Sequence, residues 1–90
     1  MSNVVVIDFT AVWCGPCRMQ EPIIDELKKE FEGKVEFKKI DVDQNGELAD
    51  KYNIMAVPTL IIEKDGNIFK KYVGLTKTQS LVDAINNALE

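Results

Sequence analysis

Residues 4 to 9 form a nearly continuous apolar run, Val-Val-Val-Ile-Asp-Phe, close to the start of the chain. The run is rich in β-branched residues and lacks the alternation of a half-exposed strand, so it predicts a central strand covered on both faces. Helices must then pack on the faces of its sheet, which indicates an α/β architecture. A chain of 90 residues with 46% hydrophobic content is enough for one compact core, and we expect a single domain over residues 1–90.

The next segments predict a helix followed by a second strand. Between residues 16 and 31, apolar side chains recur at spacings of one, three and four, with charged residues between them. This pattern is typical of an amphipathic helix, and Gly33 favours its end. Residues 35–42 begin with alternating apolar and charged side chains, as in a strand. Because a helix links the two strands, we expect a right-handed parallel β-α-β unit.

The remaining residues predict a short helix, a hairpin and a closing helix. The short helix is expected over residues 47–52, and strands over 59–63 and 68–73 are joined by a tight turn at Asp65-Gly66. Apolar positions between 81 and 89 line one face of the closing helix, and Thr76 with Gln79 predicts a capping box before it. The expected order is β-α-β-α-β-β-α, a mixed four-stranded sheet with three helices.

Charge and composition exclude several classes of protein. The formal net charge is −4 and the acidic residues are spread along the chain, so nucleic acid is not an expected partner. The first residues lack a basic segment and Asp8 interrupts the apolar run, which argues against a signal peptide or membrane span. A cytoplasmic location is therefore expected. In that reducing compartment, two cysteines indicate a chemical role more than a structural disulfide.

The two cysteines lie in Trp13-Cys14-Gly15-Pro16-Cys17, where the first strand has ended and the first helix begins. Unpaired N–H groups and the helix dipole favour a thiolate at Cys14, which we therefore interpret as the nucleophile. Cys17 lies one helical turn later, within reach of an internal disulfide, and is interpreted as the resolving thiol. Pro16 suits a first helical turn and Gly15 permits a tight bend.

This cysteine pair has three other interpretations. A structural zinc site needs four ligands, but the chain has two cysteines and no histidine, which leaves only an intermolecular site. Attachment of haem would require a histidine where Arg18 stands. An inert buried pair is the third alternative, and the helix-start position argues against it. No metal is expected.

The segment Asp8-Phe9-Thr10-Ala11-Val12-Trp13-Cys14-Gly15-Pro16-Cys17-Arg18 resembles the active-site segment of thioredoxins. Further motifs in the same order resemble that family across essentially the whole chain. They are Pro22 as its kink proline, Val57-Pro58-Thr59 as its cis-proline loop, Lys64-Asp65-Gly66 as its hairpin turn and Gly74 as its groove glycine. The resemblance implies a thioredoxin-like fold.

The resemblance assigns roles to two charged residues of the predicted sheet. Asp8 matches the carboxylate that helps to deprotonate the resolving cysteine, and it shares strand parity with Val4 and Val6, so burial should raise its pKa. A solvated aspartate at a strand end is the alternative. Lys39 matches the lysine that partners this acid, with its stem expected to face inward, and an exposed lysine is the alternative.

The resemblance also implies a shallow docking surface for substrate. A cis bond at Pro58 would turn the Val57 backbone toward Cys14, where it could pair with an extended substrate segment. A strand-opening proline is the alternative. The remaining expected substrate-binding residues are Trp13 as an apolar wall, the spacer Gly15 and Pro16, and Met55, Ala56 and Gly74.

The implied activity is protein-disulfide reduction through a redox-active Cys14–Cys17 disulfide, with no bound cofactor. The Cys14 thiolate attacks a disulfide of a partner protein, and Cys17 then resolves the mixed disulfide. Electrons would return from a thioredoxin reductase. The Gly15-Pro16 spacer resembles that of reducing family members. A glutathione-dependent glutaredoxin-like role and a non-catalytic binding module of the same fold are the alternatives.

The sequence departs from the family at three places. It lacks the opening strand and helix of most thioredoxins and so resembles the compact archaeal versions. Residues 35–42 should therefore form a sheet edge, defended by Lys34, Lys38 and Lys39, and we expect a monomer. Thr10 stands where an aromatic residue is common, and Val12 where a polar one is frequent, which bears on the choice of partner.

Overall fold

The computed structural model describes residues 3–90. The described elements, in chain order, are β1 (Val4–Thr10), α1 (Gly15–Glu30), β2 (Val35–Asp41), α2 (Gly46–Lys51), β3 (Thr59–Lys64), β4 (Asn67–Val73) and α3 (Thr78–Leu89). This is the order expected from the sequence, and the predicted fold class is confirmed.

One mixed sheet forms the centre of the described chain, with the strand order β2-β1-β3-β4. Strand β1 runs parallel to β2 and antiparallel to β3, and β3 forms an antiparallel hairpin with β4. The predicted edge position of the strand after Gly33 is confirmed, because within residues 3–90 β2 pairs only with β1. The most apolar strand, β1, thus has a neighbour on each side.

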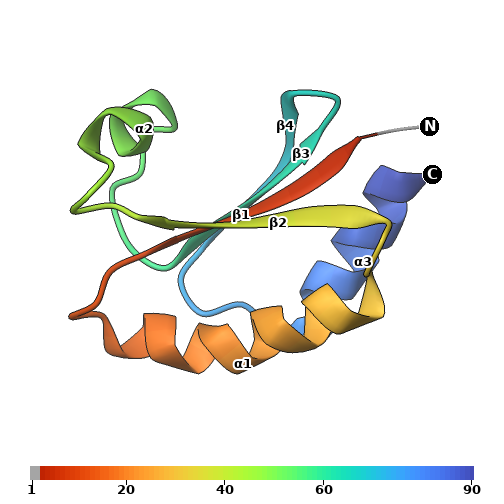
Figure 1. Ribbon diagram of the computed structural model, residues 1–90, viewed down its shortest axis with the longest axis horizontal. Helices are drawn as coiled ribbons and strands as arrows, with labels where there is room; N and C mark the ends of the chain where they lie inside the picture. Colours follow the sequence, from red (N-terminus) through yellow and green to blue (C-terminus); the bar gives the residue numbers. More distant parts are fainter. Residues whose placement is uncertain (1–2) are drawn as a thin grey trace.

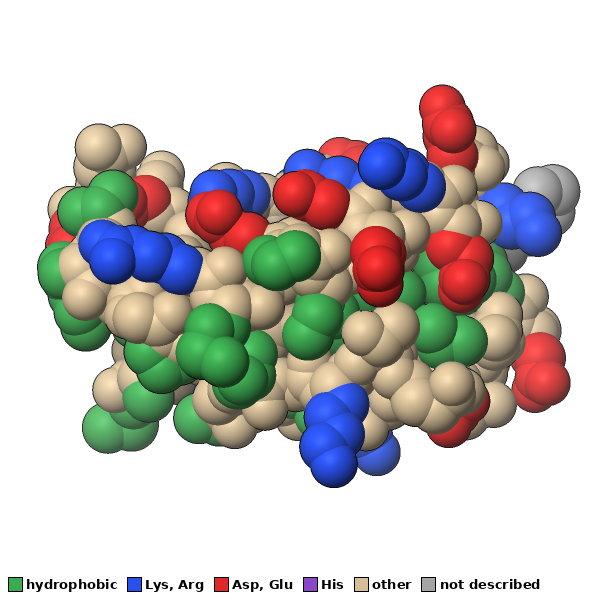
Figure 2. All heavy atoms as spheres, turned by 90° about the horizontal axis from the view of Figure 1, so that it is seen from below, with side chains coloured by type: hydrophobic (Ala, Val, Ile, Leu, Met, Phe, Trp, Pro, Cys, Tyr) green, Lys and Arg blue, Asp and Glu red, His purple; other side chains and the backbone are tan. Residues whose placement is uncertain are grey.

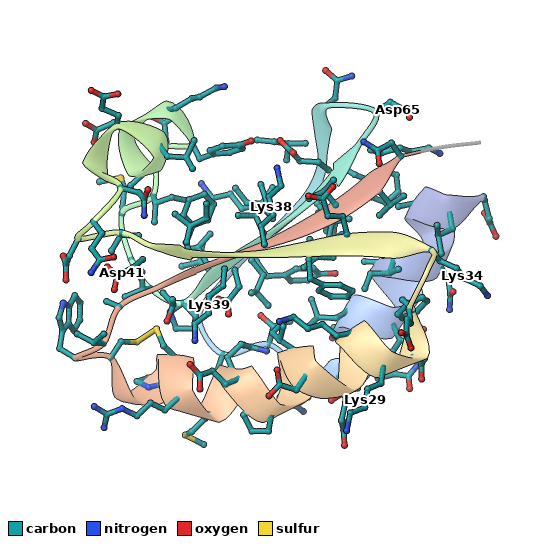
Figure 3. All side chains as sticks on the ribbon, in the orientation of Figure 1. Lys29, Lys34, Lys38, Lys39, Asp41 and Asp65 are labelled. Carbon is teal, nitrogen blue, oxygen red and sulfur yellow. A yellow bond between two sulfur atoms is a disulfide. The ribbon has the colours of Figure 1, made fainter. Side chains whose placement is uncertain are left out.

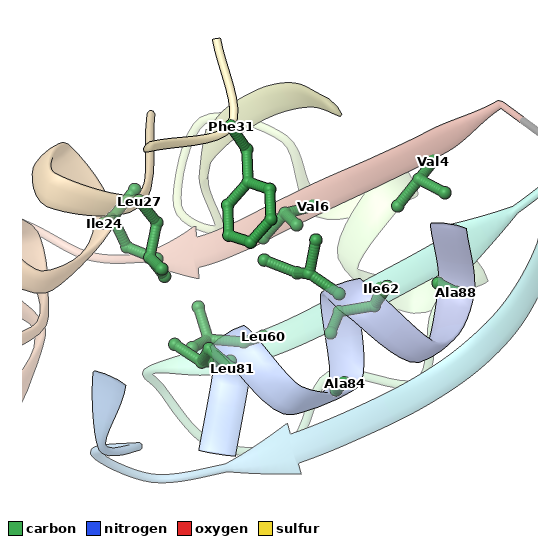
Figure 4. Close-up of a cluster of buried hydrophobic side chains, with 11 residues drawn as sticks. Val4, Val6, Ile24, Leu27, Phe31, Leu60, Ile62, Leu81, Ala84 and Ala88 are labelled. Carbon is green, nitrogen blue, oxygen red and sulfur yellow. The ribbon is translucent and has the colours of Figure 1, made fainter. Parts of the chain in front are cut away.

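Helices cover both faces of this sheet. Figure 1 shows α1 and α3 on one face and α2 on the other. Every residue of β1 is buried because its side chains alternate between the two layers. Val4 and Val6 pack with residues of α1 and α3, as Figure 4 shows, whereas Val5 and Ile7 pack with the α2 side. The lack of alternation in the sequence is explained by these two apolar layers.

The capping box predicted from Thr76 and Gln79 is wrong. The residue before α3 is Lys77, and its side chain makes no capping hydrogen bond. The Thr76 hydroxyl instead donates to the Gly74 carbonyl oxygen at 3.0 Å, and Gln79 Nε2 donates to Asp83 Oδ1 at 2.9 Å. The helix starts too late for Thr76 to cap it, and competing bonds within the loop and along the helix occupy both side chains.

The carboxyl end of β1 and the amino end of α1 meet at one end of the molecule, opposite the C-terminus (Figure 1). Within residues 3–90, no helix has the length and apolar character needed to cross a bilayer.

Candidate active site

The two cysteines lie at the start of α1, three residues apart. Cys14 is the residue before the helix, with extended backbone angles (φ −92°, ψ 111°), and its sulfur accepts a hydrogen bond from the Cys17 N–H at 3.1 Å. Pro16 stands in the first turn, where the N–H that it lacks would have no helical partner. The turn thus presents a free main-chain donor to the sulfur of Cys14.

Cys14 and Cys17 are joined in a disulfide, visible as the yellow bond at the start of α1 in Figure 3. Their Cα atoms are 5.2 Å apart, within the usual range for such a bond. Both residues are buried and pack with Ala11, Val42 and Val57. The internal disulfide expected from the three-residue spacing is confirmed.

The loop before β3 lies directly beside the first cysteine. The Val57–Pro58 peptide bond is cis, as the resemblance implied. The Cys14 sulfur lies 3.6 Å from the carbonyl oxygen of Val57. Pro58 is buried, and its own carbonyl oxygen accepts a hydrogen bond from the Gly74 N–H at 2.8 Å. The disulfide, the Val57–Pro58 segment and Gly74 are therefore neighbours.

Exposed apolar side chains lie on one side of the disulfide, around Val42 and Val57, which pack against the two cysteines. Trp13 is 67% exposed and Met55 is 95% exposed. Together with Val57 they line a shallow hollow of about 150 Å³, whose other lining residues are Val42, Ile54 and Ala56. Figure 2 shows hydrophobic side chains gathered toward the end of the molecule where α1 begins. Gly74, which adopts a φ of 92°, lies outside this hollow. We call the residues of the hollow, together with Pro58 and the loop that begins at Gly74, the rim of the active site.

The indole of Trp13 is held by a residue that the sequence did not suggest. Its Nε1 donates a hydrogen bond to Asp43 Oδ2 at 2.8 Å. Asp43 follows β2, and its position thirty residues from Trp13 carries no local signal for the contact. Only the parallel pairing of β1 with β2 brings the two loops together.

Asp8 is a buried carboxyl beneath α1. It is 3% exposed, and among the described residues its Oδ1 has no hydrogen-bond partner. Burial raises the pKa of Asp8 from 3.8 to about 6. The positive charge of Lys39 opposes this shift and the negative charge of Glu21 adds to it. The burial inferred from strand parity is confirmed, and the carboxyl titrates close to neutrality.

Lys39 is the β2 partner of Asp8 in the sheet register, but its ammonium group pairs with Glu21 of α1. Figure 3 shows Lys39 pointing from β2 toward that helix. Lys39 is exposed, and its hydrogen bond lowers the pKa of the Glu21 carboxyl and raises the pKa of the lysine. Glu21 was not anticipated from the sequence, although its position one turn after Cys17 could have drawn attention to it.

A small cavity of about 130 Å³ adjoins the Asp8 carboxyl. It is lined largely by charged side chains, from Asp8, Glu21, Asp25, Lys28, Lys38 and Lys39, with Ile24 as the apolar member. The buried acid therefore has polar surroundings on the side of β2 and α1. Within residues 3–90, no group of three or more potential ligands is placed to hold a metal ion.

Comparisons with known proteins agree with this geometry. The family model for thioredoxin matches residues 1–87. A thioredoxin from Staphylococcus aureus is 43% identical over 88 residues, which is 98% of this chain and 85% of that protein. The chain belongs to the thioredoxin family. Its redox centre is the Cys14–Cys17 disulfide, and its activity is that of a thiol:disulfide oxidoreductase.

Solved thioredoxins share this fold. A mutant thioredoxin from Halobacterium salinarum is 41% identical, with a TM-score of 0.90, over 98% of this chain and 76% of that one. A thioredoxin from Fasciola hepatica is 42% identical, with a TM-score of 0.87, over 96% of this chain and 81% of that one. Membership of the thioredoxin family implies substrates that contain disulfides and a thioredoxin reductase as partners.

Proposed function

We propose that this protein reduces disulfides in partner proteins and is itself oxidised to the Cys14–Cys17 disulfide. The observation that carries the proposal is the 3.1 Å hydrogen bond from the Cys17 N–H to the Cys14 sulfur at the start of a helix. A donor at this position stabilises negative charge on Cys14 in the reduced protein, and the thiolate is the attacking species in disulfide exchange.

The reaction proceeds in two successive thiol–disulfide exchanges. The Cys14 thiolate attacks one sulfur of the partner's disulfide, and the other partner sulfur leaves as a thiolate. Cys17, after losing its proton, attacks Cys14 and releases the second partner sulfur. The partner gains two electrons, and this protein ends with the 14–17 disulfide. A thioredoxin reductase then returns two electrons to that disulfide, with no bound cofactor or metal in this chain.

Asp8 serves in this proposal as the acceptor of the Cys17 proton. A carboxyl whose pKa is raised to about 6 is ionised in most molecules at neutral pH, yet it takes up a proton more readily than an exposed aspartate. Lys39 acts through its charge, which holds this pKa below the value that burial alone would produce. The cavity beside Asp8 offers a polar route toward solvent.

The substrate segment docks in an extended form against the rim of the disulfide. The main chain at Val57 supplies hydrogen-bonding groups next to Cys14, in the manner of strand addition. Trp13 and Met55 offer exposed apolar contact. The other substrate-contacting positions in the proposal are Gly15, Pro16, Ala56 and Gly74. Pro58, whose side chain is buried, contributes through the cis bond that orients the Val57 main chain.

We assign the protein to a reducing compartment, the cytoplasm, where a dithiol is maintained for this direction of transfer. Residues 1–90 act as one domain and as a monomer. The charges of Glu36 and Lys38 support the assignment as a monomer, because they are exposed along the open sheet edge at β2.

Insulin reduction tests the proposal. The wild-type protein, supplied with dithiothreitol, should accelerate precipitation of the insulin B chain, and it should also turn over with NADPH and thioredoxin reductase. Absence of insulin turnover would favour a binding module and overturn the proposal. Activity with glutathione and glutathione reductase, but none with thioredoxin reductase, would favour the glutaredoxin-like role.

A further inference from the structure

One side chain of α1 differs from the rest of its buried stripe. The buried residues of the helix are Cys17, Gln20, Ile24 and Leu27, and Gln20 is fully buried although it carries an amide. A polar side chain in such a position destabilises the fold unless its hydrogen-bonding groups are satisfied. An apolar residue at this position would continue the stripe and would need no hydrogen bonds. The buried amide of Gln20 therefore needs specific hydrogen-bond partners.

Those partners are the two main-chain groups of a single residue in the loop between β4 and α3. Gln20 Nε2 donates to the Thr76 carbonyl oxygen at 3.0 Å, and the Thr76 N–H donates to Gln20 Oε1 at 2.8 Å. The two residues are 56 positions apart in sequence. One side chain therefore fixes both the position and the orientation of the Thr76 peptide groups against the active-site helix.

Further hydrogen bonds connect Thr76 to both loops beside the disulfide. Its hydroxyl donates to the Gly74 carbonyl oxygen at 3.0 Å, and the Gly74 N–H donates to the Pro58 carbonyl oxygen at 2.8 Å. Pro58 is joined to Val57, whose carbonyl oxygen lies 3.6 Å from the Cys14 sulfur. The connection thus starts at Gln20, one turn after Cys17, and returns to the disulfide through the rim.

We infer that Gln20 is a positioning residue that holds the rim segments at 56–58 and 74–76 in register with the disulfide and so determines the affinity for polypeptide substrates. This inference rests on the proposed function, because it assumes that substrate segments dock on these loops. Gln20 itself is buried and does not touch substrate.

The geometry predicts an effect that depends on the size of the substrate. A polypeptide disulfide must contact the sulfur and the rim together, so misplacement of the rim weakens its encounter. A small aromatic disulfide such as 5,5′-dithiobis(2-nitrobenzoate) needs only the sulfur. Loss of the Gln20 hydrogen bonds should therefore lower the rate with a polypeptide disulfide more than the rate with the small disulfide. A general loss of stability should lower both rates alike.

The main test is Gln20→Met, which keeps the length and helix preference of the side chain but removes both hydrogen bonds to Thr76. Pre-reduced protein is mixed with insulin or with the small disulfide, and samples are quenched in acid, alkylated and counted by mass for the oxidised form. We expect the second-order rate with insulin to fall about tenfold and the rate with the small disulfide to change less than about twofold.

Two further variants keep the result decisive. Thr76→Val removes only the hydroxyl link to Gly74, so it should lower the insulin rate selectively even if Gln20→Met does not fold. Ile85→Val is the control, because Ile85 is buried in α3 and takes no part in the hydrogen bonds that run from Gln20 to the rim. It should leave the ratio of the two rates unchanged.

The inference is overturned if the folded variants lose both rates equally, if neither rate falls, or if Ile85→Val shows the same selective loss. Failure of the wild-type protein to reduce insulin would instead contradict the proposed function. Amide hydrogen exchange gives a second measurement, since the Thr76 N–H should exchange faster in Gln20→Met than in the wild type.

Discussion

The main-chain N–H of Cys17 donates a hydrogen bond to the sulfur of Cys14, whereas within residues 3–90 no group donates one to the sulfur of Cys17. The two sulfurs are therefore chemically unequal although their residues are similarly buried. This asymmetry predicts that only one of them begins an attack on a foreign disulfide.

Single serine variants test the order of attack. Cys17→Ser leaves Cys14 able to attack but removes the resolving thiol, so a mixed disulfide with a partner protein should accumulate. Cys14→Ser should form no such adduct, and both variants should lose essentially all insulin turnover. Non-reducing electrophoresis followed by mass measurement detects the adduct. Stable adducts on Cys17 in the Cys14→Ser protein would reverse the proposed roles.

Asp8 should make the oxidised protein less stable as the pH rises from about 4 to about 6. Below the unfolded pKa of 3.8 the carboxyl is protonated in both states, whereas between 3.8 and about 6 only the unfolded chain releases the proton. The free energy of unfolding therefore falls across this window, and the contribution of Asp8 is constant above it.

The variant Asp8→Asn removes that dependence. It should raise the free energy of unfolding at pH 7 by on the order of 2–3 kcal/mol and leave it nearly unchanged at pH 3.5. Urea unfolding of the oxidised protein at several pH values measures the difference. Asp50→Asn, an exposed position on α2, is the matched control and should show no such gain. A constant offset between Asp8→Asn and wild type at every pH would contradict the burial argument.

The sequence predicted those features that depend on local pattern. The apolar run at residues 4–9 indicated a central strand, and the position of Cys14 between strand and helix followed from it. Burial of Asp8 followed from its parity with Val4 and Val6. Each of these properties depends on residues close together in the chain, so spacing alone contained the information.

The unpredicted features are contacts between segments far apart in the chain. Gln20 meets Thr76, Glu21 meets Lys39, and Trp13 meets Asp43 only after the sheet has paired and α1 has packed on it. Thr76 shows why a local motif can fail, since its hydroxyl and main chain bind Gly74 and Gln20 before the helix begins.

Glu21 should influence Asp8 through charge. Its carboxylate lies near the buried acid, raises the pKa of Asp8, and binds the ammonium of Lys39. Glu21→Gln should therefore lower the pKa of Asp8 below about 6, and Lys39→Met should raise it. Carbon-13 NMR titration of the Asp8 carboxyl measures both shifts. Glu26→Gln, on an exposed position of the same helix, is the control. An unchanged titration in Glu21→Gln would show that its charge does not reach Asp8.

Asp43 should hold the indole of Trp13 in place. Asp43→Ala removes the 2.8 Å hydrogen bond to Nε1, and because the bond is exposed the loss of stability should be below about 1 kcal/mol. Trp13 is the single tryptophan of the chain, so its fluorescence anisotropy reports its motion directly. Anisotropy should fall in Asp43→Ala and remain at the wild-type value in Asp50→Ala. Equal anisotropy in all three proteins would mean that packing alone orders the ring.

The charges along β2 should keep its open edge from pairing with another chain. On β2, Lys38 Nζ lies 3.8 Å from Glu36 Oε2, and about half of each side chain is exposed. Figure 3 shows Lys38 on the β2 ribbon. Apolar, β-branched residues at these two positions would remove the charges and favour strand pairing. We therefore expect the wild type to elute from gel filtration as a 10.2 kDa monomer and the double variant Glu36→Val/Lys38→Val to form dimers or larger species.

The control is the double variant Lys70→Val/Lys71→Val on β4, the other edge strand of the sheet, which tests whether the effect on association is specific to the β2 edge. A wild-type dimer, or a double variant that stays monomeric at high concentration, would contradict the protective role of the β2 charges.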